Sequence, residues 1–121
     1  MTATVTPQGR APRISQTRRS GATVLRPVGA LDRSLAEEIR GIALEVHGPV
    51  VVDLEEAVLV DAASVQRIIL GWQFYRPPMC IVCRRPAARS LLQRAEVHEH
   101  VSVFESVEAA LDTGGWRPRR P

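Results

Sequence analysis

Two cysteines in the middle of the chain have the spacing of a redox pair, Cys80-Ile81-Val82-Cys83. Redox pairs of this kind sit at a helix start, whereas these cysteines lie in an apolar run that predicts a strand. Residues three apart on a strand point to opposite faces, so we expect no direct disulfide and interpret both as buried apolar residues. Arg84, Arg85 and the start of the next helix could nevertheless lower the thiol pKa of Cys83. A redox-responsive protein with a reactive Cys83 is therefore one alternative.

The histidines and carboxylates could serve in metal binding or in acid–base catalysis. His98 and His100 could join the cysteines as zinc ligands, but they follow no zinc-finger spacing, and we expect them in a surface loop. Asp32, Asp53 and Asp61 could hold magnesium or exchange protons, yet a turn, a strand end and a helix cap explain them separately. The chain also has no P-loop, no GxGxxG motif and no Ser-His-Asp arrangement that such a fold would assemble. We therefore expect a binding protein with no enzymatic activity, metal or cofactor.

The elements that must position these residues alternate along the chain. Strands are expected at 14–19, 22–28, 49–54, 79–83 and 101–104, and helices after Ser34, after Asp61, from Pro86 and over 107–111. Strands that alternate with helices imply a single α/β domain with a mostly parallel sheet and helices packed on it. We place this domain at residues 13–112, between a flexible tail at 1–12 and a basic tail at 113–121.

Local sequence signals add detail to three of these elements. Ser34-Leu35-Ala36-Glu37 matches a capping box, so the first helix should begin at Ser34 after a turn at 29–32. The apolar run 49–54 is expected to be a strand covered on both faces of the sheet. Helical spacing places four apolar residues on the buried face of the second helix: Val65, Ile68, Ile69 and Trp72.

Composition narrows the function further. All 16 basic residues are arginine, which excludes lysine-based catalysis, and the net charge is +3 with a pI of about 9.6. A basic nucleic-acid-binding protein is therefore a second alternative, although several of the arginines lie in the expected tails. No apolar run approaches the ~18 residues of a membrane span, and residues 1–13 contain no apolar signal segment. We expect a cytoplasmic protein that does not enter a membrane.

Four segments in order resemble the STAS domain, the fold of bacterial anti-sigma factor antagonists. They are Gly29-Ala30-Leu31-Asp32, Val50-Val51-Val52-Asp53-Leu54, Val60-Asp61-Ala62-Ala63-Ser64-Val65 and the closing stretch 103–111. The resemblance implies a regulatory module for transcription that captures an anti-sigma factor, in many cases a serine kinase, and so frees a sigma factor. It also implies a partner-binding surface at the head of the second helix and the adjacent turn, formed by Asp32, Asp61, Ala62, Ala63, Ser64 and Val65.

The chain departs from the family pattern at this helix head. The family's phospho-acceptor serine falls on Ala63, which has no hydroxyl, and the family's glycine falls on Ser64. Free N–H groups in a first helical turn favour an anion, so a phosphate on Ser64 would be tolerated, although Asp61 would oppose it. The Ser64 hydroxyl lies about 100° further round the helix than the usual acceptor. We therefore interpret Ser64 as an ordinary first-turn residue and keep its phosphorylation as an alternative.

Overall fold

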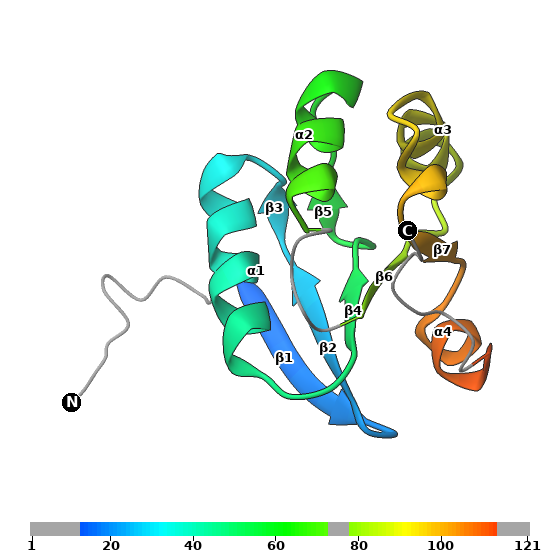
Figure 1. Ribbon diagram of the computed structural model, residues 1–121. Helices are drawn as coiled ribbons and strands as arrows, with labels where there is room; N and C mark the ends of the chain where they lie inside the picture. Colours follow the sequence, from blue (N-terminus) through cyan, green and yellow to red (C-terminus); the bar gives the residue numbers. More distant parts are fainter. Residues whose placement is uncertain (1–12, 73–77, 114–121) are drawn as a thin grey trace.

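A five-stranded sheet forms the framework of the described part of the molecule (Figure 1). The computed structural model describes residues 13–72 and 78–113. The strands are β1 (Ile14–Arg19), β2 (Ala22–Pro27), β4 (Val50–Asp53), β6 (Met79–Val82) and β7 (Ser102–Phe104), in the order β1-β2-β4-β6-β7. β1 pairs with β2 antiparallel and the other neighbours pair in parallel, which confirms the expected mostly parallel sheet.

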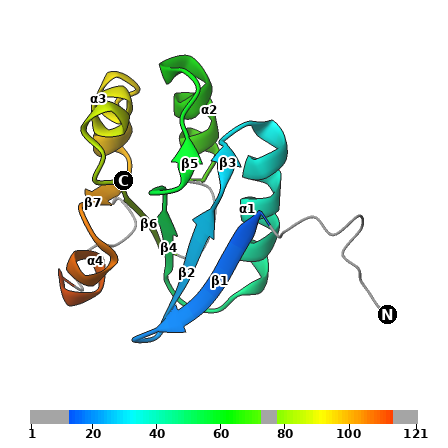
Figure 2. The same ribbon diagram turned by 180° about the vertical axis from the view of Figure 1, so that it is seen from behind.

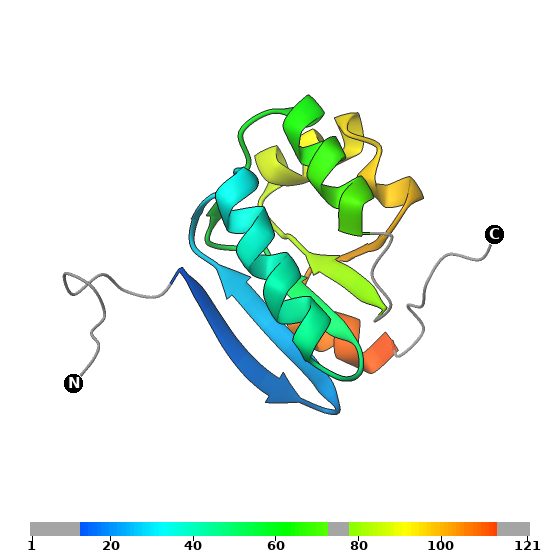
Figure 3. The same ribbon diagram turned by 60° about the vertical axis from the view of Figure 1, so that its left-hand side comes forward.

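Helices cover the two faces of this sheet unequally. They are α1 (Arg33–Glu45), α2 (Ala62–Trp72), α3 (Pro86–Arg94) and α4 (Val107–Thr113). In Figure 3, α1 and α2 lie in front of the sheet and α4 lies behind it. The core is divided in the same way, because Val50 and Val52 pack with residues of α1, α2 and α3, while Val51 packs with residues of α4. All three valines are fully buried, which confirms a strand covered on both faces.

The buried face of α2 agrees with the predicted spacing except at one residue. Val65, Ile69 and Trp72 are buried in the core that α1, α2 and α3 share. Ile68 is only half-buried and packs at the margin of that core. Each residue of a helix is turned by about 100° from the one before it, so Ile68 and Ile69 cannot both point straight at the sheet.

The first helix begins differently from the prediction. Asp32, not Ser34, is its N-cap: the backbone of Asp32 is extended, and its Oδ1 accepts the N–H of Leu35 at 2.8 Å. The capping-box prediction was wrong because Ser34 already lies inside the helix. An aspartate two residues earlier satisfies the free N–H groups of the first turn instead.

A second, two-stranded sheet stands where the sequence indicated only a turn. β3 (Gly29–Ala30) pairs in parallel with β5 (Ala57–Val58), and Figure 2 shows the pair at one end of the central sheet. Two-residue strands are too short to show a periodic pattern in the sequence. The pair therefore depends on long-range contact between the segments that lead into α1 and α2.

The remaining predictions on chain organisation fall mostly outside the described residues. This holds for the tail at 1–12 and for the tail at 113–121 apart from Thr113, which is the last residue of α4. None of the helices in the described ranges is long and apolar enough to cross a lipid bilayer.

Candidate partner-binding site at the head of helix α2

Asp61 caps α2, as the sequence predicted. Its Oδ1 accepts the backbone N–H of Ser64 at 2.8 Å, and its Oδ2 accepts the Ser64 hydroxyl at 3.1 Å. The backbone N–H of Ser64 is the main cause that lowers the pKa of Asp61, and the Ser64 hydroxyl and the positive charge of Arg67 add to it. The carboxylate thus already occupies the place that an anion would take at this helix start.

The predicted surface residues differ in their exposure. Ala63 is exposed at the helix head, and Ala62 and Ser64 are half-buried. Val65 is fully buried in the core, so it cannot touch a partner as predicted. Its role is instead to anchor the first turn of α2 against the sheet, and the surface that remains is made of small side chains.

Asp32 lies on the opposite wall of the same hollow as Ser64. Its side chain is 53% exposed, with Arg13 Nη2 at 3.8 Å from Oδ1. Both residues line a groove of about 440 Å³ between α1 and α2, which we call the α1–α2 groove. The structure therefore brings together Asp32 and the α2 head, which are about thirty residues apart in sequence.

The two-stranded sheet holds these two segments side by side. Gly29 donates its N–H to the carbonyl of Glu56 at 3.2 Å, and Leu31 donates to Val58 at 2.9 Å. Three exposed apolar side chains surround this sheet: Val28 at 47%, Val58 at 57% and Val60 at 55% exposed. These valines were missed in the sequence, because a short run of apolar residues looks the same whether it is buried or exposed.

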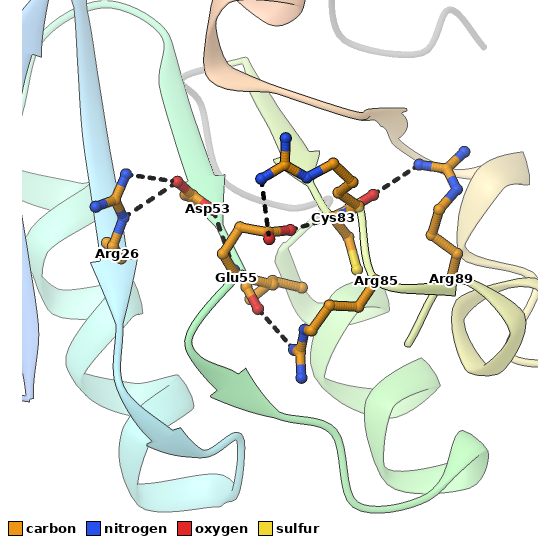
Figure 4. Close-up of polar contacts among 8 residues, drawn as sticks. Arg26, Asp53, Glu55, Cys83, Arg85 and Arg89 are labelled. Carbon is orange, nitrogen blue, oxygen red and sulfur yellow. Dashed lines mark hydrogen bonds and ion pairs between the residues drawn. The ribbon is translucent and has the colours of Figure 1, made fainter. Parts of the chain in front are cut away.

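A chain of arginine contacts fixes the loop between β4 and β5 (Figure 4). Arg26 binds the buried carboxylate of Asp53 through Nε at 3.1 Å and Nη2 at 2.9 Å. Arg85 donates from Nη2 to the carbonyl of Leu54 at 2.9 Å and also to the carbonyl of Ala57. The loop that leads to the α2 head is therefore held at both ends.

The three aspartates singled out in the sequence have separate partners. Asp32 and Asp61 cap α1 and α2, and Asp53 forms the ion pair with Arg26. Within the described ranges, no three His, Cys, Asp or Glu side chains are grouped so that they could hold a metal ion.

Both cysteines are free and buried, on opposite faces of the sheet. Cys80 packs in the core beneath α4, and Cys83 packs in the larger core on the other face. Burial raises the pKa of the Cys80 thiol to about 12. Burial also raises the pKa of Cys83, and the charges of Arg85 and Arg89 oppose this without reversing it. The burial of both thiols confirms their interpretation as buried apolar residues. The alternative of a lowered Cys83 pKa is not supported, because burial outweighs the lowering by the arginine charges.

His98 is not in an open loop. It belongs to a 3₁₀ helix, Val97–Glu99, and is half-buried, and neither ring nitrogen has a hydrogen-bond partner among the described residues. Burial, followed by the charge of Arg89, lowers its pKa. The expectation of a surface loop was wrong because buried Val97 draws this segment against the core.

Comparisons with known proteins point to one fold. No family model matches the chain, and no curated protein matches its sequence. An anti-sigma factor antagonist from Mycobacterium paratuberculosis has a similar structure, with a TM-score of 0.70 and 16% identity over 83% of this chain and 91% of that one. The anti-sigma factor antagonist SpoIIAA in its unphosphorylated form superposes with a TM-score of 0.56 and 18% identity, over 84% and 96% of the two chains. At such low identity these similarities establish the fold alone, and the chain has the STAS-like fold.

Proposed function

We propose that this chain is a regulatory protein-binding module of the anti-sigma factor antagonist type, without enzymatic activity, in the cytoplasm of a bacterium. Its partner is an anti-sigma factor, and the contact is made by Asp32, Asp61, Ala62, Ala63 and Ser64. The observation that carries the proposal is the exposed Ala63 at the start of α2, beside a groove that reaches Asp32. Small side chains there let another backbone approach closely.

The exposed valines extend the proposed surface. Val28, Val58 and Val60 are three large apolar side chains that the folded domain leaves 47–57% exposed. Exposed apolar groups that gather beside a polar rim mark interaction surfaces more often than scattered ones do. A partner on the α2 head would cover them.

We propose that this protein has no phosphorylation switch at the head of α2. Ala63 has no hydroxyl, and the Ser64 hydroxyl is engaged by Asp61. A phosphate on Ser64 would break this bond and bring two anions together. We therefore expect an antagonist whose binding is not controlled by a kinase.

The binding proposal is tested by Ala63→Glu, with Ala87→Glu as its control. Ala87 is an exposed alanine in the first turn of α3, so both variants add the same charge at an equivalent helix position. Acidic residues suit a first turn, so neither should lower the melting temperature. Titration calorimetry with purified anti-sigma factors should show at least about tenfold weaker binding for Ala63→Glu, or about 1.4 kcal/mol. Equal binding by both variants would move the interface elsewhere.

The absent switch is tested by intact-mass spectrometry after incubation with an anti-sigma factor kinase and ATP. The parent protein should stay unmodified, and Ala63→Ser should gain one phosphate. Stoichiometric phosphate on the parent that Ser64→Ala abolishes would show that Ser64 is the acceptor after all.

The two alternative functions are tested separately. The burial of Cys83 does not support a redox role. A nucleic-acid-binding function predicts a gel shift with DNA that weakens steeply with salt.

A further inference from the structure

The α1–α2 groove, which shares Asp32 and Ser64 with the proposed partner surface, is also a candidate site for a small ligand. Its walls are faces of α1 and α2, which lie side by side in Figure 3. Its lining combines apolar residues and charged ones: Leu31, Ala36, Val60, Ile68 and Trp72, with Arg33, Glu37, Arg40 and Arg67. We propose that this groove binds a small amphipathic anion, with an apolar body and one carboxylate, phosphate or sulfonate group.

The size of the groove suits a small molecule. Ligand sites for small molecules commonly measure about 300–1,000 Å³, and this groove measures about 440 Å³. An aromatic or short aliphatic body therefore fits it.

The charges of the groove select an anion. Glu37 pairs with Arg40 at 3.9 Å, and Asp32 accepts the N–H of Leu35 and faces Arg13. The side chains of Arg33 and Arg67, in contrast, form no hydrogen bond or ion pair with any residue in the described ranges.

The charge of Arg67 acts on the carboxylate of Asp61. It helps to lower the pKa of Asp61, but that carboxylate is held by Ser64. The available charge at the groove is therefore positive, and a ligand with one negative group would complement it.

Gly71 provides a way to close the groove without damage to the fold. It lines the groove inside α2, and a Cβ added there would meet no atom within 4 Å. Gly41 in α1 is matched to it: it is also helical, also has no atom within 4 Å of an added Cβ, and does not line the groove. Both substitutions replace a helical glycine by a residue of higher helix propensity, so neither should destabilise the protein.

The experiment uses 8-anilino-1-naphthalenesulfonate as the anionic probe and N-phenyl-1-naphthylamine, which lacks the sulfonate, as its neutral counterpart. Fluorescence titration of the full chain should show saturable one-to-one binding of the sulfonate, at least tenfold tighter than binding of the neutral probe. Amide shifts in a two-dimensional NMR spectrum should centre on Ala36, Ile68 and Gly71. Gly71→Leu should abolish binding of both probes, and Gly41→Leu should leave it unchanged.

The arginines are tested with a double variant. The variant that combines Arg33→Gln with Arg67→Gln should bind the sulfonate probe at least tenfold more weakly. Its affinity for the neutral probe should not change. Arg94→Gln, in exposed α3 sequence away from the groove, should change neither.

Three results would each overturn the proposal. They are equal affinity for the two probes, undiminished binding by Gly71→Leu, and amide shifts centred away from the groove. Circular dichroism spectra and melting curves of every variant establish that a loss of binding is not a loss of fold.

Discussion

The ion pair between Asp53 and Arg26 should contribute measurably to stability, and Asp53→Asn tests this. The Asp53 side chain is 3% exposed; Oδ2 accepts two hydrogen bonds from Arg26, and Oδ1 accepts the N–H of Glu55 at 3.0 Å. The asparagine oxygen can still accept the N–H of Glu55. Its NH₂ group, however, faces the guanidinium of Arg26, so two donors meet and no hydrogen bond forms. Breaking a buried pair costs about 3–5 kcal/mol. The Arg26 side chain is 46% exposed and regains water, so we expect about 2–3 kcal/mol.

The reverse truncation should cost more. Arg26→Gln leaves a buried carboxylate without its cation, which costs about 3–5 kcal/mol. The double variant replaces the ion pair by two amides that can bond to each other. The double variant should therefore lose less free energy of unfolding than the two single variants lose in sum, by about 1–3 kcal/mol.

Urea unfolding at neutral pH, followed by circular dichroism, measures all four proteins. Arg84→Gln is the control, because Arg84 is 72% exposed and lies 4.0 Å from Glu55. An exposed pair of this kind contributes about 0–1 kcal/mol. Additive losses, with a coupling below about 0.5 kcal/mol, would refute the claim that Arg26 and Asp53 act as an energetic pair.

Three further predictions concern the core, the thiols and the helix cap. Ile69→Ala should lower the free energy of unfolding, measured in urea, by about 2–5 kcal/mol, because Ile69 is 1% exposed. Ile68 is half-buried, so Ile68→Ala should lower this free energy less. Equal decreases would show that the buried face of α2 is assigned wrongly. Ellman's reagent should modify Cys80 and Cys83 far more slowly in the native protein than in urea, because burial raises both pKa values; a native rate near that of free cysteine would contradict this. Asp61→Asn should be less stable than the parent at pH 7, because the folded-state pKa of Asp61 lies below its ordinary value of 3.8. The difference should shrink as the pH falls through that lower folded value, and a difference that is independent of pH in urea titrations would contradict the cap.

The order of the elements could be predicted from the sequence because it depends on local patterns. The apolar run at 49–54, interrupted only by Asp53, predicted a strand buried on both faces, and Val50, Val51 and Val52 are each fully buried. Helical spacing predicted a buried α2 face of Val65, Ile68, Ile69 and Trp72, and all of these except the half-buried Ile68 are buried. Such patterns work because side-chain direction repeats with the local geometry of the backbone.

The candidate site could be predicted in part. Asp61 three residues before Ser64 is a local capping signal, and the bond between them is present at 2.8 Å. That position 63 carries an alanine without a hydroxyl is visible in the sequence alone. The burial of Val65 was not anticipated at the site, although the same residue had been placed on the buried face of the helix.

The tertiary structure alone decided how the site is assembled. The pairing of β3 with β5 joins residues that are almost thirty positions apart, and no local pattern encodes it. The α1–α2 groove and the raised pKa of Cys83 likewise depend on which elements pack around them. The sequence by itself determined the strands of the central sheet and the four helices, because each depends on neighbours along the chain. Only the folded structure determined the groove, the second sheet and the raised pKa of Cys83, because each depends on neighbours in space.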